Sequence, residues 1–345
     1  MRGCHHCDGP ILILHMKKTL IGNFILLFAA VIWGFAFVAQ VVSVESGLGP
    51  VSFNAVRFML GAVVLIPVIL IFDRKGIGFD KKLIFGSLIC GTLLFCAANL
   101  QQYALTVNSD PGFAGFITSL YTVWTPVAYF FIFRKKTPLT VWVAVAVSVL
   151  GFYLLCMTDG GGIHFGVDVI VLLISTLFWT AQILAVDHFV KVSSALKLSF
   201  GQFFVCACLS FIYAFVFERE GLTMASISGA KWSILYCGIL SVGVAYTLQV
   251  VGQKITNPVF AVIIMSTESV FSAIGGVLWN LIVPVFLRID QNISAVGYVG
   301  CGLIFGGVVL AQIDVVGMIR NKKASKASRI ASDTERIGDR YENDI

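Results

Sequence analysis

One ionisable side chain lies near the middle of a long apolar stretch of this chain. The stretch runs from Pro258 to Trp279, and Glu268 is its only charged residue. Because a helix rises about 1.5 Å per residue, this stretch can cross the hydrocarbon core of a membrane, which is about 30 Å thick. A carboxylate at that depth costs about 2.5–3.5 kcal/mol on insertion scales and usually marks a functional site. We therefore expect Glu268 to exchange a proton or to balance a cationic substrate group. The alternative is a protonated or hydrogen-bonded Glu that only packs helices.

A second charge, Arg57, lies about seven residues into another apolar stretch. At the helical rise, this depth is roughly 10 Å below the membrane surface. The guanidinium could attract a substrate carboxylate. It could equally extend back toward the surface or pair with Glu45 in the preceding loop.

Amide side chains are frequent within the apolar stretches. Lipid does not solvate an amide, so most should face the protein interior, where they bond between helices or contact a substrate. They are Gln40, Asn54, Asn99, Gln101, Gln102, Gln182, Gln202, Gln249 and Gln253. Gln182 follows Trp179 by three positions, so the two should share a helix face. We select Gln102, Gln182 and Gln249 as candidate substrate-binding residues.

Aromatic residues within the stretches complete the candidate site. Trp and Tyr usually lie at membrane interfaces, but Trp33 and Trp179 lie deep in their stretches. They could form facing walls of an aromatic cavity, as small-molecule sites often have, or they could pack helices tightly. Tyr103 and Tyr246 are further candidate binding residues.

The composition predicts an all-α integral membrane protein. Hydrophobic residues make up 58% of the chain and charged residues only 12%, whereas about a quarter of a soluble domain is charged. The formal net charge of +6 comes from short basic runs between apolar stretches, so it does not indicate a nucleic-acid partner.

Ten stretches have the length and apolarity of membrane spans. Their approximate ranges are 20–42, 50–72, 83–105, 111–133, 138–157, 167–186, 194–217, 232–253, 258–287 and 295–318. Lys and Arg in short loops favour the cytoplasm. With a cytoplasmic N-terminus, twenty of the 24 basic residues fall on inner segments and three, Arg219, Lys231 and Arg288, on outer loops. We therefore expect a multi-pass protein of the cytoplasmic membrane with both termini in the cytoplasm.

The two halves of the chain resemble each other at an offset of about 146 positions. The aligned pairs are Trp33 with Trp179, Arg57 with Gln202, Gln101 with Gln249, Pro111 with Pro258, and Tyr121 with Glu268. Each half holds five predicted helices, and an odd number means that the second half enters the membrane from the opposite side. Inverted repeats are a recurrent transporter architecture, with the substrate site near the midplane.

Several of these features together resemble the EamA family of the drug/metabolite transporter superfamily. They are Trp33-Gly34 in the first span, Pro50, Phe53 and Arg57 in the second, Ser266-Thr267-Glu268 in the ninth, and a Gly-rich last span in each half. The resemblance implies two inverted five-helix EamA repeats, at 17–158 and 164–318, in a ten-helix carrier that usually exports amino acids, other metabolites or toxic compounds. The family often has Pro directly after the Glu of the ninth span. Here that residue is Ser269, which could hydrogen-bond within the span instead.

The two ends of the chain fit neither repeat. Cys4, His5, His6 and Cys7 could form part of a metal site, but no second ligand pair follows at zinc spacing. We expect instead that residues 1–16 are an extension and that translation starts at Met16. Residues 319–345 carry charges of both signs and read as a cytoplasmic tail.

The sequence therefore predicts a secondary transporter that exports a small metabolite, such as an amino acid or an amphipathic toxic compound, by alternating access. Its expected partners are the substrate, the lipid bilayer and protons, and the protein could be a monomer or a homodimer. We expect no cofactor, no metal and no enzymatic activity, since the chain has no Walker-type loop, GxSxG elbow or HExxH pair. The alternative is a membrane scaffold with a closed interior.

Overall fold

The computed structural model describes residues 8–73, 80–133, 139–157, 162, 164–256, 258–283, 288–289, 293–307 and 309–310. For residues 8–19, 126, 129–130, 132–133, 139–141, 258–260 and 263 it describes the backbone only. The Cys4–Cys7 segment and the predicted tail at 319–345 lie outside the described residues.

Within that part of the chain, six helical segments are long and apolar enough to cross a membrane. They are Leu20–Val44 within α1 (Asp8–Val44), α2 (Pro50–Phe72), α3 (Lys81–Val107), α7 (Val167–Phe189), α8 (Ala195–Phe217), and Lys231–Ile255, which comprises α10 (Lys231–Leu235), the π-helix η1 (Tyr236–Tyr246) and α11 (Thr247–Ile255). Local signals set several of these ends: Pro50 opens α2, and the Asp80 carboxylate accepts a hydrogen bond from the Leu83 N–H to cap α3. These six correspond to six of the predicted spans.

Two other predicted spans are each broken into a pair of shorter helices. The span 111–133 becomes α4 (Pro111–Thr118) and α5 (Tyr121–Phe133), and the span 258–287 becomes α12 (Pro258–Ser266) and α13 (Glu268–Ile282). At each break a hydroxyl bonds a carbonyl three residues back: Ser119 Oγ donates to Phe116 O at 2.7 Å and Thr267 Oγ1 to Ile264 O at 2.6 Å. Such bonds compete with the helical pattern and bend the backbone.

The second break forms without a proline. The Thr267 N–H donates to Ile264 O at 3.2 Å, an i to i+3 bond that tightens the last turn of α12. Ser269 Oγ donates to Ser266 O at 2.9 Å, so the predicted hydrogen bond of Ser269 within its span is confirmed.

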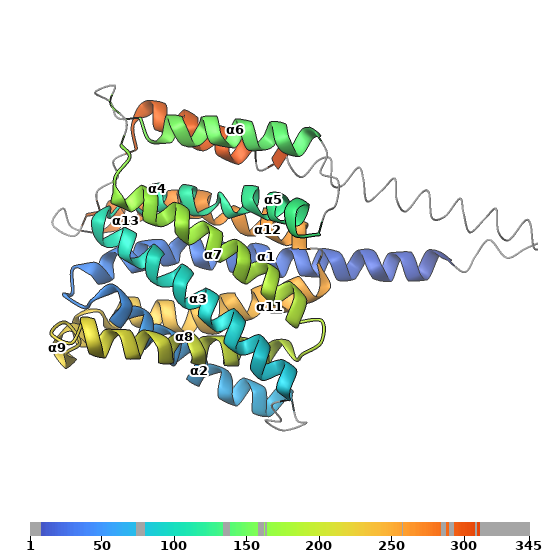
Figure 1. Ribbon diagram of the computed structural model, residues 1–345, viewed down its shortest axis with the longest axis horizontal. Coiled ribbons are helices and arrows are strands. Elements are labelled where there is room, and N and C mark those ends of the chain that lie inside the picture. The colour runs from blue at the N-terminus through green and yellow to red at the C-terminus, as the bar shows by residue number, and fades with distance from the viewer. Residues whose placement is uncertain are drawn as a thin grey trace, which may run out of the picture.

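The last predicted span of each half forms a shorter apolar helix. These are α6 (Leu139–Leu155) and Ala295–Gly307, which lie together at the top of Figure 1. They meet at two glycines, where a Cβ added to Gly151 would lie only 2.7 Å from the carbonyl oxygen of Gly300. Small residues at this crossing allow the two backbones to approach closely.

Contacts between helices occur in pairs that the two halves of the chain share. α1 in the first half and α7 in the second are equivalent. α1 packs against η1 and α11, and α7 packs against their counterpart α3. In the same way α1 packs against the half-helices α12 and α13, and α7 packs against α4 and α5. Likewise α2 contacts η1, as α8 contacts α3, while α2 and α8 pack along each other. Figure 1 shows the long helices running in similar directions, with α2 and α8 on the side away from α6. The helices of the two halves are therefore interleaved.

A pair of phenylalanines marks the centre of this arrangement. Phe58 of α2 and Phe203 of α8 are fully buried, with ring centroids 6.3 Å apart. Both rings also contact Tyr246 of η1, at 6.0 and 5.9 Å. Next to this cluster lies a cavity with polar walls.

Candidate functional site

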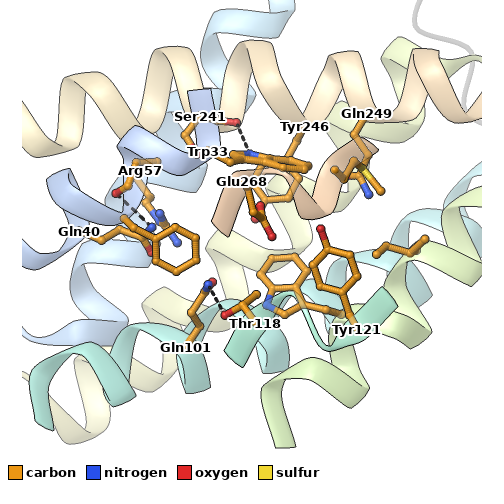
Figure 2. A pocket seen from close by; sticks show the side chains of 15 residues that line it. Trp33, Gln40, Arg57, Gln101, Thr118, Tyr121, Ser241, Tyr246, Gln249 and Glu268 are labelled. Carbon is orange, nitrogen blue, oxygen red and sulfur yellow. Dashed lines mark hydrogen bonds between the residues drawn. The ribbon is translucent and has the colours of Figure 1, made fainter. Parts of the chain in front are cut away.

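A cavity with polar and aromatic walls lies between the two halves of the chain (Figure 2). Its lining residues are Trp33, Ala36, Phe37, Gln40, Arg57, Gln101, Thr118, Tyr121, Trp179, Ile183, Ser241, Tyr246, Gln249, Met265 and Glu268. The space open to the centres of water-sized molecules is about 40 Å³. This volume holds a few waters but no drug-sized ligand, so the cavity is small in this conformation.

Most of the lining consists of residues that the internal repeat pairs with each other. At offsets of 146 to 148 positions the pairs are Trp33 with Trp179, Phe37 with Ile183, Gln101 with Gln249, Thr118 with Met265, and Tyr121 with Glu268. The two repeats thus contribute equivalent positions to one cavity.

Glu268 is the first residue of α13, directly after the break in its span. Its side chain is 5% exposed and interacts with the Tyr121 hydroxyl, which lies beside it in Figure 2. A carboxylate in the first turn of a helix is favoured by the unbonded N–H groups and the helix dipole there. Among the described residues, no basic side chain forms an ion pair with Glu268.

Arg57 supplies the opposite charge from α2 and is only 2% exposed. Its guanidinium carbon lies 5.3 Å from the ring centroid of Phe53 and 5.1 Å from that of Phe58, so both rings stabilise the cation. No described carboxylate lies within ion-pair distance, and Nε has no hydrogen-bond partner among the described residues. The predicted alternatives of pairing with Glu45 and of reaching the surface are therefore not seen.

Three aromatic rings of the cavity lining are joined by contacts through Tyr246. The Tyr246 ring lies 4.7 Å from that of Trp33 and 6.0 Å from that of Trp179, with the latter pair stacked at 20°. Trp33 Nε1 donates to Ser241 O at 3.3 Å, whereas Trp179 Nε1 finds no hydrogen-bond acceptor in the residues that the structure describes. Both tryptophans line the cavity, with Tyr246 in contact with each of them.

Amide side chains of the cavity donate hydrogen bonds to the protein, but some of their oxygen atoms have no bonded donor in the part that the structure describes. Gln101 Nε2 donates to Thr118 Oγ1 at 3.3 Å, and Gln40 Nε2 donates to Ala36 O at 3.2 Å. The Oε1 atoms of Gln40 and Gln249 are buried and have no hydrogen-bond partner within the described part of the chain. Buried acceptors without partners are unfavourable unless a ligand or water supplies a donor.

Six of the nine residues selected from the sequence come together in this cavity. They are Trp33, Arg57, Trp179, Tyr246, Gln249 and Glu268. The structure does not bring the other three, Gln102, Tyr103 and Gln182, to the cavity.

Helix rotation explains these three positions. On α3 it is Gln101 that faces the cavity, while Gln102 Nε2 donates to Gln40 O at 3.2 Å and Tyr103 is 45% exposed on the outer surface. On α7 the cavity-facing partner of Trp179 is Ile183, four residues on. Gln182 is turned toward α8, where its amide donates to Gln202 Oε1 at 3.0 Å.

Polar lining residues that were not selected are Gln40, Gln101, Thr118, Tyr121 and Ser241. The repeat carried the signal for two of them, because Gln101 aligns with Gln249 and Tyr121 aligns with Glu268. Ser241 contributes its backbone carbonyl, which no side-chain pattern could indicate.

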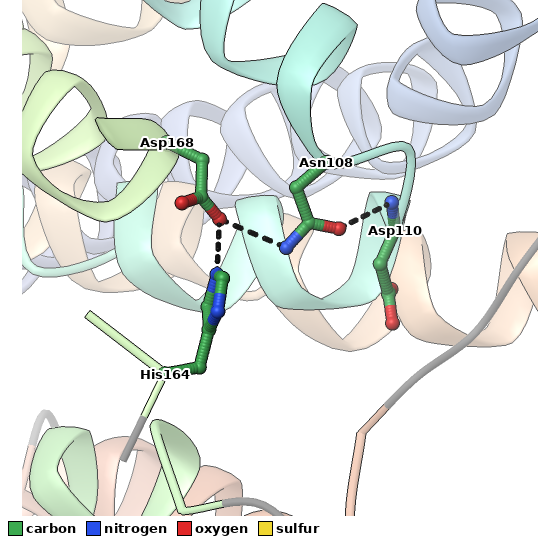
Figure 3. A network of polar contacts seen from close by, with 4 residues as sticks. All are labelled: Asn108, Asp110, His164 and Asp168. Atoms are coloured by element: carbon green, nitrogen blue, oxygen red, sulfur yellow. Dashed lines mark hydrogen bonds and ion pairs between the residues drawn. The ribbon is translucent and has the colours of Figure 1, made fainter. Parts of the chain in front are cut away.

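A separate polar network joins the α3–α4 loop to the start of α7 (Figure 3). Asp168 Oδ2 accepts from Asn108 Nδ2 at 2.9 Å and contacts His164 Nε2 at 2.8 Å. Asn108 Oδ1 in turn accepts from the Asp110 N–H at 3.2 Å, and Asp110 Oδ1 caps α4 by accepting from the Phe113 N–H at 3.0 Å. This network fixes where α4 begins, and thereby the position of Thr118. Within the described part of the chain, no His, Cys, Asp and Glu side chains group as metal ligands.

Sequence comparison assigns the chain to a family. The EamA-like transporter family matches it twice, at residues 20–157 and 167–313. The chain belongs to the EamA-like transporter family. It is therefore a multi-pass membrane protein of a transporter family, and the resemblance noted from Trp33-Gly34 and the ninth-span Glu is confirmed.

Two further similarities agree with this assignment. An "Uncharacterized transporter" of Archaeoglobus fulgidus is 27% identical to this EamA protein over 298 residues, which cover 86% of this chain and 88% of that protein. A solved structure, described only as "Crystal structure of protein", has a TM-score of 0.59 at 20% identity, covering 85% of this chain and 96% of that chain. The second similarity concerns the fold alone.

Proposed function

We propose that this EamA protein is a secondary transporter with ten spans, which exports a small metabolite across the cytoplasmic membrane by alternating access. The observation that supports this best is the polar cavity lined by residues of equivalent positions in both repeats. In this topology the half-helix pairs α4–α5 and α12–α13 each make one crossing, α6 and the Ala295–Gly307 helix make one each, and both termini are cytoplasmic.

The matched helix contacts support the alternating mechanism. Five helices in each repeat place the two repeats in opposite orientations, so each outward-facing contact has an inward-facing counterpart. Rocking one repeat against the other would then expose a fixed central site to each side in turn. The small cavity fits a closed conformation between the two open ones.

The cavity chemistry indicates the kind of substrate. Arg57 and Glu268 present opposite charges, while Trp33, Trp179 and Tyr246 offer apolar ring surface. A small amphipathic molecule with an apolar part and polar or charged groups satisfies both. A scaffold with a closed interior would fill this space with Leu and Phe, and the polar lining gives that alternative no support.

We further propose that Glu268 carries the coupling proton. It lies between the repeats, borders the cavity and has no ion-pair partner among the described residues. A carboxyl group that faces a cavity can take a proton from one side and release it to the other as the repeats rock.

Transport by Glu268→Gln in proteoliposomes tests this coupling. A thermal-shift screen of amino acids, nucleobases and cationic drugs first identifies a ligand, because a ligand of the folded state raises the melting temperature. With that ligand, the wild-type flux should increase under an imposed pH gradient, and Glu268→Gln should abolish the response, since a neutral amide cannot release a proton.

Glu220→Gln is the matched control, because Glu220 is an exposed acidic residue outside the cavity. It should keep the full response to the gradient. A Glu268→Gln protein that responds as strongly as this control would refute the coupling role. An absence of flux in wild-type vesicles for every ligand that shifts the melting temperature would refute transport itself.

A further inference from the structure

Two acidic residues end the helices α2 and α8, which pack side by side. Asp73 is the C-cap residue of α2 and Glu218 is the C-cap residue of α8. The two are 145 positions apart, the same offset that relates Phe58 to Phe203 and Arg57 to Gln202. They therefore occupy equivalent positions in the two repeats.

Glu218 binds the start of the partner helix. Its Oε1 accepts from the Val51 N–H at 3.1 Å, and its Oε2 accepts from the Ser52 N–H at 2.7 Å and from Ser52 Oγ at 2.8 Å. The N-cap residue of α2 is Gly49, which has no side chain to cap the helix. Glu218 thus supplies, from the other repeat, the cap that α2 lacks.

Asp73 makes the corresponding contact at the other end of the pair. Its Oδ2 accepts from Ser194 Oγ at 2.7 Å, and its Oδ1 lies 3.5 Å from Lys197 Nζ. Ser194 is the N-cap residue of α8 and makes no capping bond with its own side chain. Because α2 and α8 are antiparallel, the Asp73 and Glu218 contacts lie at opposite ends of the pair.

Resting on the alternating-access function proposed above, we infer that these contacts are two latches between the repeats, which open one at a time during transport. The Glu218 latch comprises Glu218 with Val51 and Ser52, and the Asp73 latch comprises Asp73 with Ser194 and Lys197. Access to the cavity from one side requires the repeats to separate at that side. Each latch therefore opposes one of the two open conformations, and both are closed in the conformation described here. Asp73 and Glu218 are positioning residues in this scheme, since neither lines the cavity.

Hydrogen–deuterium exchange of the full chain in lipid nanodiscs can separate the two ends. In Glu218→Gln, peptides covering 49–56 and 214–222 should exchange about tenfold faster, because charge-assisted hydrogen bonds are lost. Peptides covering 68–73 and 194–200 should exchange slower, by roughly twofold, because the conformation that opens the Asp73 end loses population to the one that opens the Glu218 end. Asp73→Asn should give the reverse pattern.

The slower exchange at the distant end is the decisive readout. A carboxylate that only caps its neighbouring helix would speed exchange locally and leave the distant end unchanged, and that result would overturn the proposal. Glu220→Gln, two residues from Glu218, should change neither end. If a charge variant fails to fold, Ser52→Ala and Ser194→Ala remove one hydrogen bond from each latch and should give weaker shifts in the same opposite directions.

The double variant Asp73→Asn/Glu218→Gln adds an independent check. Both ends should then exchange faster than in the wild type, with the ratio between the ends restored to the wild-type value. If the ratio of exchange rates in the double variant instead equals that of either single variant, the two latches do not oppose each other. Transport by the wild-type protein is measured separately. If the wild-type flux is normal but the exchange at the distant end does not change in the variants, the latches are refuted and the transport function is not.

Discussion

Arg57 and Glu268 are the two charged side chains of the cavity, and neither is neutralised by an ion pair among the described residues. Isolated charges are costly in a membrane protein interior. The structure reduces the cost locally, with two phenyl rings around the guanidinium and a hydroxyl and a helix start around the carboxyl. Both charged groups therefore line the cavity without a counter-ion among the described residues.

Trp179 gives a test of ligand binding at this scale. Trp179→Ala should raise the Kd of the ligand found by thermal shift about tenfold, because an aromatic surface worth roughly 1.4 kcal/mol is lost. Trp179→Phe should keep most of the affinity, since a ring remains. Isothermal titration measures both, with Trp142→Ala on the exposed surface of α6 as the control. Equal Kd values for Trp179→Ala and the control would place the ligand elsewhere.

The charged residues of the cavity could be predicted from the sequence, whereas the direction in which each amide side chain faces could not. Glu268 and Arg57 were identifiable because charges stand out in apolar stretches. Gln182 was selected because it follows Trp179 by three positions, yet the residue that shares the cavity face is Ile183. Spans that are apolar all round give little indication of their rotation, so packing against neighbours decides which amide faces the cavity.

At the scale of elements, the ends of a long helix such as α2 could be predicted from the sequence, whereas the breaks within two of the spans could not. The predicted span 50–72 coincides with α2, because Pro50 opens the helix and polar residues follow Phe72. The spans 111–133 and 258–287 are continuous in hydropathy, and at each break a hydroxyl, that of Ser119 or Thr267, bonds a carbonyl three residues back. The two breaks lie at equivalent positions, and each is followed by a cavity residue, Tyr121 in one repeat and Glu268 in the other.

The crossing of α6 with the Ala295–Gly307 helix can be tested by glycine replacement. Gly300→Leu should lower the free energy of unfolding by about 1–3 kcal/mol, since the new side chain would overlap the backbone near Gly151. Gly302→Leu, on the same helix but with no atom within 4 Å of an added Cβ, should be nearly neutral. Thermal melting in detergent compares them. Equal melting temperatures would show that this crossing does not form.

At the scale of the whole molecule, the two repeats share a plan that runs from helix contacts to single residues. Equivalent helices make equivalent contacts, five residue pairs line one cavity, and Asp73 and Glu218 cap equivalent helices. In the proposed mechanism, opposite orientations of the two repeats provide two equivalent ways to open the molecule, one to each side. The proposed mechanism therefore requires the two repeats to have opposite orientations in the membrane.

Sided labelling of Lys82→Cys and Met224→Cys measures that orientation most directly. Both positions are exposed: Lys82 lies in the first turn of α3, the third helix of its repeat, and Met224 follows α8, the second helix of its repeat. With native cysteines replaced and a membrane-impermeant thiol reagent applied to intact cells, the account predicts that Met224→Cys reacts from outside. Lys82→Cys should react only after the membrane is opened. Reaction of both positions from the same side would contradict the inverted repeat and the alternating access built on it.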